Sequence, residues 1–397
     1  MASHGIKDKV AIVGMACTPF AEHWDKNLDD LLVDCADELF TSSGIAKADI
    51  DAYWFGVASS AMSGMPLARA LKTDFRPITR IENFCATGAE ALRNACYAVA
   101  SGAYDTAVAI GGEKVKDGGY QGLPATQPPN DGTVRSLTAA AMFSLIVPAY
   151  ANKYGVDPDE LKDVLTRIAW KNHSNGSHNP RAQFQKEISK EVIKNAMPIA
   201  GPLGVFDCAG VGDGSAAAIV VRAEDAHKYT DKPLYVKALA MVAGTGSGNL
   251  DPDYDYTTFP EVVRAGEDAY QQAGVTDPRR EIAMAEVHDC FTPTELVLVE
   301  DLGFAERGMG WKEVMAGTFD LDGDLPVNPD GGLKSFGHPI GASGLRMMYE
   351  CWLQLRGEAP PDRRINTTDK KLGLTHNLGG YPGEMVSFVG IVGAEKG

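Results

Sequence analysis

Residues 81–90 read Ile-Glu-Asn-Phe-Cys-Ala-Thr-Gly-Ala-Glu, and they place Cys85 between a short apolar run and a helical pattern that ends near Ser101. A thiol at a strand-to-helix junction lies close to free backbone N–H groups and to the positive end of the helix dipole, which lower its pKa. The position therefore indicates a nucleophile. The alternative is that Cys85 is one more small buried apolar residue, as most free cysteines are.

The same junction recurs later in the chain. Residues 85–93 (CATGAEALR) align with residues 338–346 (HPIGASGLR) at a constant offset, and His338 then stands where Cys85 stands. The order of the surrounding elements also repeats, which indicates a duplication. Cys85 and His338 are therefore predicted to meet where two equivalent helix N-termini converge. The matching pairs are Gly88/Gly341, Ala89/Ala342, Leu92/Leu345 and Arg93/Arg346.

Apolar and amphipathic patterns outside these junctions predict the fold class. Strands alternate with helices in both halves, so we predict an α/β fold with a largely parallel sheet. The strand at 384–393 is predicted to correspond to residues 104–113. The other predicted elements are strands at 9–14, 53–57, 106–112, 234–244 and 281–288, and helices at 28–40 and 259–274.

An insertion separates the two halves, and the predicted domains are 8–115, 116–233 and 234–397. The insertion is rich in Gly, Pro, Asn and Gln at 122–132, helical at 157–171, and polar and loop-like at 171–184. Basic residues gather in it: Lys162, Arg167, Lys171, Arg181, Lys186, Lys190 and Lys194. Such a run is either a solvated face or a site for a polyanionic ligand.

Composition excludes several classes of function. The 397 residues carry a formal net charge of −16, which argues against non-specific nucleic-acid binding. The seven cysteines are scattered and never spaced as CxxC, so neither a disulfide framework nor a zinc motif is predicted. No signal peptide or membrane span is expected, and a cytoplasmic location fits best.

Three further segments could supply chemistry beside Cys85. They are 287–291 (VHDCF) at the end of a predicted strand, 337–341 (GHPIG) and 375–380 (THNLGG). A lone histidine is more often structural than catalytic. Together, however, the segments offer a nucleophile, a base, a second thiol and donors that stabilise an anion, which are the parts of acyl transfer through a thioester.

At these residues the chain resembles the thiolase family over about residues 8–393. The His-Asp-Cys-Phe and His-Asn-Leu-Gly-Gly forms are those of the sterol-carrier-protein-type thiolases, and no sterol-carrier domain is expected to follow. The resemblance implies a thiolase fold, in which two duplicated βαβαβ halves form a five-layered α-β-α-β-α core with an inserted loop domain.

The resemblance also implies roles for individual residues. His338 would take the proton of Cys85, which attacks an acyl-CoA thioester and becomes acylated. Cys290 would be the acid/base on the acetyl-CoA α-carbon, and His288 with His338 would hold its enolate oxygen. The N–H groups of Cys85 and Gly379 would stabilise the tetrahedral intermediate. Asn377 belongs to the same loop as Gly379, and His376 either takes part or makes a structural hydrogen bond.

The resemblance further implies coenzyme A thioesters as substrates, with no metal and no tightly bound cofactor. Coenzyme A is expected near residues 162–194 and 244–248. The partners expected are a second or further copies of the chain, as a homodimer or homotetramer, and possible association with a small acyl-CoA-binding protein. Two departures from the family stand out: Thr87 where serine is common, and Tyr381-Pro382 beside the glycine loop, which could reshape the pocket.

Three functions stay open on the sequence. The first is an acyl-CoA C-acyltransferase, which needs Cys85, His338 and Cys290, all present. The second is a thiolase-fold aldolase acting on a steroid or lipid side-chain CoA thioester, a branch that tends to lose the nucleophilic cysteine. The third is a non-catalytic acyl-CoA or lipid-binding protein on the same scaffold, because fold alone does not determine function.

Overall fold

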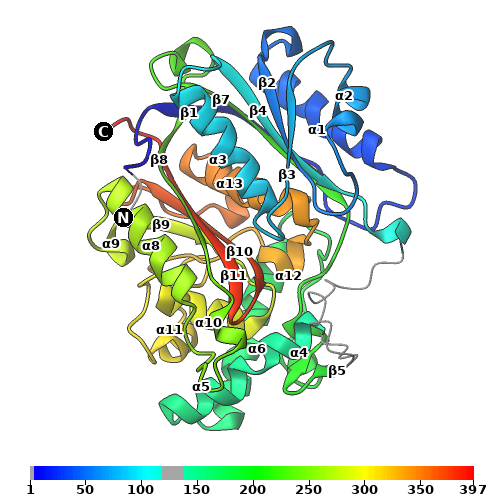
Figure 1. Ribbon diagram of the computed structural model, residues 1–397. Helices are drawn as coiled ribbons and strands as arrows, with labels where there is room; N and C mark the ends of the chain where they lie inside the picture. Colours follow the sequence, from blue (N-terminus) through cyan, green and yellow to red (C-terminus); the bar gives the residue numbers. More distant parts are fainter. Residues whose placement is uncertain (1–3, 119–137) are drawn as a thin grey trace.

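A nine-stranded sheet runs through the molecule in the order β3-β2-β4-β7-β1-β8-β11-β10-β9 (Figure 1). The computed structural model describes residues 4–118 and 138–397, so the predicted Gly- and Pro-rich stretch 122–132 lies outside the described residues. The two halves of the sheet meet between β1 (Val10–Cys17) and β8 (Leu234–Ala243), which are paired over only two residues each. The sheet is therefore joined only weakly at its centre, and its two halves can be described separately.

Helices cover both halves and also fill the space between them. α1 (Leu28–Ser43) and α2 (Met65–Leu71) pack on the first half, and α8 (Pro260–Ala273) packs on the second. α3 (Thr87–Ala100) and α13 (Ile340–Leu355) lie side by side between the halves (Figure 1). The layers thus run α-β-α-β-α, and the predicted α/β class and five-layer order are confirmed.

Side-chain alternation along the strands explains this layering. In β4 (Thr106–Glu113), Val108 and Ile110 belong to the apolar cluster around α1, whereas Ala107 and Ala109 belong to the cluster around α3 and α13. Successive residues of a strand point to opposite faces, so a strand buried on both faces needs apolar residues throughout. The small alanines on the inner face let the central helices lie close to the sheet.

The prediction of a largely parallel sheet was wrong. Among the described residues, five of the eight neighbouring pairs in this sheet are antiparallel and three are parallel. The reason is one reversed strand in each half: β7 (Gly214–Arg222) lies between β1 and β4, and β11 (Glu384–Gly393) lies between β8 and β10 (Leu372–Tyr381).

These pairings also correct the predicted match between 384–393 and 104–113. β10 pairs in parallel with β9 (Ile282–Glu286), as β4 does with β2 (Ala52–Gly56), so β10 is the counterpart of β4. β11 is the counterpart of β7. Part of the segment predicted as an insertion, 116–233, therefore belongs to the sheet of the first half. The connection from β4 to β7 is long, whereas β10 and β11 are joined by a two-residue turn.

The helix predicted at 157–171 in the insertion extends further along the chain than predicted. α6 (Pro158–Ser177) continues through residues 171–177, where a polar loop was predicted. Its last turns bury Lys171, Asn172, His173 and Asn175. Because these polar side chains face other buried polar groups, the apolar periodicity that signals a helix is missing there.

The remaining elements are short or lie around the insertion. No helix in residues 4–118 or 138–397 combines the length and apolar character needed to cross a membrane. The bounds are β3 Ile78–Ile81, β5 Pro198–Ala200, β6 Leu203–Gly204, α4 Ala139–Ser144, α5 Ile146–Tyr154, α7 Lys190–Lys194, α9 Pro278–Glu281, α10 Thr292–Asp301, α11 Gly310–Ala316 and α12 Gly332–Phe336.

Candidate active site

Cys85 lies in a tight turn between β3 and α3. The residue before it, Phe84, has a φ of 48°, a left-handed conformation that is costly for a bulky side chain. The Thr87 hydroxyl holds this turn, because it accepts the Asn83 N–H at 2.8 Å and donates to the Phe84 carbonyl at 2.5 Å. Thr87 thus provides the hydroxyl that a serine would provide, and the turn aims the buried Cys85 thiol inward.

His338 stands at the equivalent position before α13, and its hydrogen bonds define its tautomer. Ser343 Oγ donates to the Pro339 carbonyl at 3.0 Å and lies 2.7 Å from His338 Nδ1. With the hydroxyl proton directed to that carbonyl, we assign the Nδ1–H tautomer, in which Nδ1 donates to Ser343 Oγ. The other ring nitrogen, Nε2, is buried without a hydrogen-bond partner among the described residues. It therefore offers a free lone pair, as a general base requires.

Glycines allow the two junctions to approach each other. A Cβ added to Gly88 would lie 2.7 Å from the Gly341 carbonyl oxygen, closer than van der Waals contact permits. These are the glycines that match between the repeats. Without a side chain at Gly88, the N-termini of α3 and α13 pack backbone to backbone. The contact at Gly88 and Gly341 is therefore one of the close backbone approaches that let the Cys85 and His338 junctions meet.

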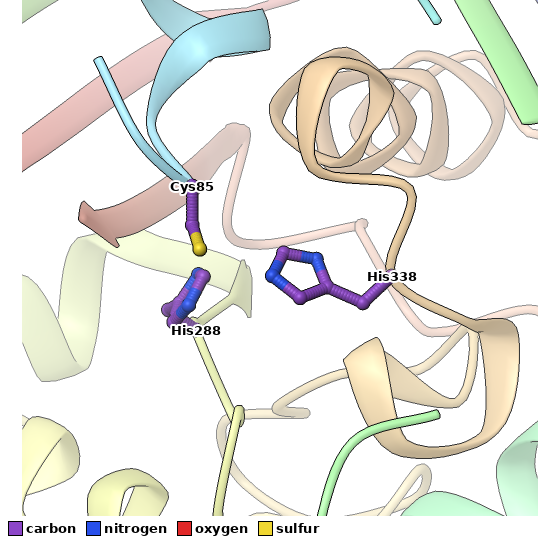
Figure 2. Close-up of side chains that lie close together, drawn as sticks. All are labelled: Cys85, His288 and His338. Atoms are coloured by element: carbon purple, nitrogen blue, oxygen red, sulfur yellow. The ribbon is translucent and has the colours of Figure 1, made fainter. Parts of the chain in front are cut away.

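Three side chains from distant segments converge at this point (Figure 2). Cys85 Sγ and one ring nitrogen each of His288 and His338 all lie within 4.8 Å of one another. The two imidazole rings meet edge to face, with centroids 5.3 Å apart. The structure thus brings Cys85 and His338 together, as the repeat predicted, and adds His288; the catalytic roles of all three stay predictions.

Burial is the largest cause of the pKa shifts of Cys85, His288 and His338. It raises the pKa of Cys85, with smaller contributions from Cys290 and nearby carboxylates, so the expectation of a lowered thiol pKa was wrong. Burial and the Arg346 cation lower the pKa of His338 to about 3, and burial lowers that of His288 as well. The resting site therefore holds a neutral thiol beside neutral imidazoles.

A neutral pair has a measurable consequence for Cys85. The rate of its alkylation by iodoacetamide is expected to rise with pH across the range 6 to 9, because the thiolate fraction still increases there. A thiolate–imidazolium pair would instead give a rate that is flat over this range. Peptide mass spectrometry after timed quenching measures the rate at Cys85 alone, and a flat profile would contradict the neutral pair.

The segment after β9 presents His288 and Cys290 and is anchored by Asp289. The buried Asp289 carboxylate accepts the Leu333 N–H at 2.6 Å, at the start of α12, and the Asn172 side-chain amide at 2.8 Å. Burial raises the pKa of this carboxyl to about 6. The Asp289 contacts tie the segment to α12 and α6 and leave both His288 ring nitrogens without a partner among the described residues.

Cys290 lies beside the cluster but outside it. Its thiol contacts Thr294 Oγ1 at 3.7 Å, and its backbone carbonyl accepts the Ala209 N–H at 2.9 Å. Burial raises the pKa of Cys290 to about 12, and the hydrogen bond to Thr294 and the buried Lys334 cation oppose that rise. Cys290 is thus a protonated thiol in a polar, enclosed setting.

The glycine loop on β10 lies against the nucleophile turn. A Cβ added to Gly379 would lie 2.7 Å from both the Asn83 carbonyl oxygen and the Phe84 Cβ. Asn377 donates to Met347 Sδ at 3.1 Å and leaves its buried Oδ1 without a partner among the described residues. His376 Nε2 lies 3.2 Å from Ser387 Oγ, which gives this histidine a structural contact.

The departure at Tyr381-Pro382 falls at the tip of the β10–β11 hairpin. Tyr381 pairs with Glu384, so Pro382 and Gly383 form the turn. The predicted coenzyme A segment at 244–248 packs on this turn: Asn249 Nδ2, one residue beyond it, donates to Glu384 Oε2 at 2.6 Å. The hairpin tip and the 244–249 segment therefore share one side of the site.

The basic residues of the insertion do not form one free patch. Five of them make ion pairs with carboxylates: Lys162 with Asp207, Arg167 with Asp320, Lys171 with Glu295, Arg181 with Glu38, and Lys194 with Asp163. Lys190 lies over the Trp170 ring at 4.2 Å. A surface pocket of about 360 Å³ between α6, α7 and α11 includes Arg167, Lys190 and Lys194. Coenzyme A binding at 162–194 stays a prediction.

Sequence reasoning did not assign three residues that support the site. Asn172 donates to Asp289 at 2.8 Å and to Glu295 at 2.7 Å, and so links α6 to the His288 segment. Ser343 orients His338. Arg346 is fully buried and contacts Glu286 and Asp330, which border the two histidine segments. The repeat match at Arg93/Arg346 was the available signal for Arg346.

Two thiolase family models and several known proteins match this chain. The family model described as "Thiolase, N-terminal domain" matches residues 10–197, and "Thiolase C-terminal domain-like" matches residues 245–389. An acetyl-CoA acetyltransferase of Methanothermobacter thermautotrophicus is 36% identical, over 94% of this chain and 97% of that protein. Sterol carrier protein 2 of Bos taurus is 30% identical, over 94% of this chain and 70% of its own length.

Solved structures show the same fold. The structure titled "Ltp2-ChsH2(DUF35) aldolase" superposes with a TM-score of 0.82 at 23% identity and covers 98% of both chains. An acetyl-CoA acetyltransferase from Syntrophomonas wolfei superposes with a TM-score of 0.69 at 17% identity, over 98% of this chain and 100% of that one. At these identities the likeness concerns the fold alone.

Proposed function

The chain belongs to the thiolase family, in the subgroup of sterol-carrier-protein-type thiolases, and from this membership we propose that it is an acyl-CoA C-acyltransferase. It would cleave 3-oxoacyl-CoA with coenzyme A, or condense an acyl-CoA with acetyl-CoA, through an acyl-Cys85 intermediate. The observation that carries the proposal is the cluster of Cys85, His288 and His338, in which His338 Nε2 keeps a free lone pair.

The first half-reaction uses Cys85 and His338. His338 Nε2 accepts the thiol proton as Cys85 Sγ attacks the thioester carbonyl, and the two neutral groups become charged only as the new bond forms. The Cys85 and Gly379 N–H groups would hold the oxygen of the tetrahedral intermediate. The close packing of Gly379 on the nucleophile turn supports this pairing. Coenzyme A leaves with the proton from His338.

The second half-reaction uses Cys290 and both histidines. The Cys290 thiol would first lose its proton to solvent; its thiolate would then remove a proton from the α-carbon of acetyl-CoA, and His288 and His338 would stabilise the enolate oxygen. The enolate then attacks acyl-Cys85, the new carbon–carbon bond forms as the bond from the acyl carbon to Cys85 Sγ breaks, and the Cys85 thiolate takes the proton that Cys290 removed. The position of Cys290 beside the cluster, next to the Lys334 cation, supports this division of labour.

Cys290→Ala should separate the two half-reactions. The variant is expected to acylate Cys85 as the parent does, but to lose condensation by at least about 10²-fold, because a general acid/base contributes that much. Acylation is measured by peptide mass spectrometry and condensation by product formation. Cys208→Ala, which removes a thiol from the neighbouring segment, is the control. If Cys290→Ala condensed at the parental rate, the acid/base assignment would be wrong.

Coenzyme A would enter past the hairpin tip and residues 244–248. This segment packs on Glu384, and the same hairpin carries Gly379 close to Cys85. The test of the whole function is incubation with acetoacetyl-CoA and coenzyme A, following loss of the enolate absorbance. No turnover with this or with longer 3-oxoacyl-CoA substrates would contradict the proposal.

A thiolase-fold aldolase on a steroid or lipid side-chain thioester is the second candidate. The structure titled "Ltp2-ChsH2(DUF35) aldolase" shares the fold, which shows that this fold occurs in an aldolase. Retention of Cys85 in an intact cluster argues against it, and against a non-catalytic acyl-CoA or lipid-binding protein. If this chain is an acyltransferase and binds a small DUF35-type protein, that partner would assist acyl transfer and would not change the reaction.

We also propose that two copies of the chain associate along β3. This strand forms one edge of the sheet, and the segments around it expose large apolar side chains at Met62, Met65, Phe75 and Phe84. An open strand edge with such side chains is a ready surface for association. Dimers or tetramers built this way would bury the nucleophile turn.

Phe75→Asp should shift the protein toward the monomer, because a charge would be buried at the proposed interface. Light scattering coupled to size exclusion measures the mass. Leu250→Asp is the control, since Leu250 is also a largely exposed apolar residue but lies just after the 244–249 segment, away from β3. An unchanged mass for Phe75→Asp would remove the β3 edge as the interface.

A further inference from the structure

The three atoms at the centre of the site are all electron-pair donors with free lone pairs. His338 Nε2 and both ring nitrogens of His288 are buried and have no hydrogen-bond partner among the described residues. Cys85 Sγ lies within 4.8 Å of one nitrogen of each ring, and Figure 2 shows the sulfur beside His288 with His338 facing it from one side. Buried polar atoms usually have a hydrogen-bond partner, so two adjacent imidazole rings with unpaired nitrogens beside a thiol call for a physical account.

The donor set and its spacing suit a zinc ion. Zinc is held by thiolate and imidazole ligands, commonly in a tetrahedral arrangement with one position open to water. Bond lengths of about 2.3 Å to sulfur and about 2.0 Å to nitrogen place ligand atoms roughly 3.3–3.6 Å apart. The three atoms here lie within 4.8 Å, so side-chain rotations would close the set.

A support that zinc sites usually have is also present. A metal-bound histidine generally donates its second ring N–H to an oxygen, which fixes the ring and its tautomer. His338 does this through Nδ1 and Ser343 Oγ, at 2.7 Å. The three ligands come from positions 85, 288 and 338, which are far apart in the sequence, so no short zinc motif of the CxxC kind marks them.

We propose that Cys85, His288 and His338 form a reversible inhibitory zinc site. On binding, the Cys85 thiol loses its proton to solvent, one bond forms to its sulfur and one to a nitrogen of each histidine, and water takes the fourth position. Zinc is not a cofactor here: it occupies the sulfur that an acyl group would take, so the metal and the acyl group exclude each other.

Direct binding tests this without any turnover. The reduced, metal-free protein is titrated with Zn²⁺ against a chromophoric chelator. One equivalent should bind tighter than about 1 μM, and Mg²⁺ should not compete, because it prefers oxygen ligands. Co²⁺ in place of Zn²⁺ should give a thiolate-to-metal charge-transfer absorption. Cys85→Ala, His288→Asn and His338→Asn should each weaken binding by at least about 100-fold, and Ser343→Ala by about 10-fold.

Controls separate this site from adventitious zinc and from misfolding. His376→Asn and Cys96→Ala remove a buried histidine and a buried thiol outside the cluster and should bind as the parent does. Alkylation of Cys85 in a Cys290→Ala background should abolish binding without altering a ligand residue by mutation. Parental affinity in Cys85→Ala or after this alkylation would overturn the proposal, and so would the absence of tight binding. The zinc titration and the zinc-free acyl-transfer assay are independent measurements. Failure of the zinc site would therefore leave the proposed acyltransferase function untouched, and failure of that function would leave the zinc-binding result untouched.

Discussion

Alanine in place of Cys85 is expected to slow both thiolysis and condensation by at least about 10⁴-fold, because covalent catalysis has no other acceptor for the acyl group. Cys290 cannot replace it, since Cys290 lies outside the cluster and its thiol contacts Thr294 rather than either histidine. The folded structure should persist, because alanine fills most of the space of a small thiol.

Cys96→Ala is the matched control for that variant. Cys96 is a buried cysteine on the same helix, α3, but it faces the apolar cluster between the halves. Its replacement should leave the rate of thiolysis unchanged. The decisive readout is kcat at saturating acetoacetyl-CoA and coenzyme A. A Cys85→Ala protein that keeps more than about 1% of the parental kcat would show that the acyl group travels by another route.

The largest expected loss of stability is that of Arg346→Met. The Arg346 guanidinium is fully buried and binds Glu286 at 2.6 Å and Asp330 at 2.5 Å. Methionine would leave these two carboxylates without their cation, and breaking a buried pair in this way costs about 3–5 kcal/mol. Urea denaturation followed by circular dichroism measures the change in the free energy of unfolding.

The repeat provides the control for this variant as well. Arg93 occupies the equivalent position on α3, but its ion pair with Glu90 is partly exposed, so Arg93→Met should cost at most about 1 kcal/mol. The Arg346→Met deficit should also shrink as the pH falls from 8 to 5. Burial already raises the pKa of Glu286, and the Arg346 cation opposes that rise; without the cation the pKa should rise further, so Glu286 would take up a proton in the folded state at higher pH than in the parent. Equal costs at the two positions would contradict this reading of the network.

The duplicated architecture could be read from the sequence because it rests on local signals. Matching glycines, an arginine and the helical pattern after each junction recur in both halves, and these residues set close packing at fixed points. The pair Gly88/Gly341 shows why: the backbone contact between α3 and α13 tolerates no side chain at Gly88. The meeting of Cys85 and His338 followed from that repeat.

Other features depend on tertiary contacts that leave no local pattern. The reversed strands β7 and β11 read like the strands beside them, so strand direction could not be predicted from periodicity. The end of α6 buries Asn172 and its neighbours against Asp289 and Glu295, which made a buried helix look like a polar loop. The predicted lowering of the Cys85 pKa was wrong for a similar reason: burial, which no local pattern reveals, raises that pKa.

The central claim is that Cys85 carries the acyl group, and peptide mass spectrometry tests it most directly. The protein is incubated with acetyl-CoA, and separately with acyl-CoA thioesters of increasing chain length, then quenched in acid and digested. The account predicts an acyl adduct on the peptide that contains Cys85, absent from Cys85→Ala and released by added coenzyme A. No adduct on Cys85 with any of these thioesters, or an adduct on Cys290 instead, would contradict it.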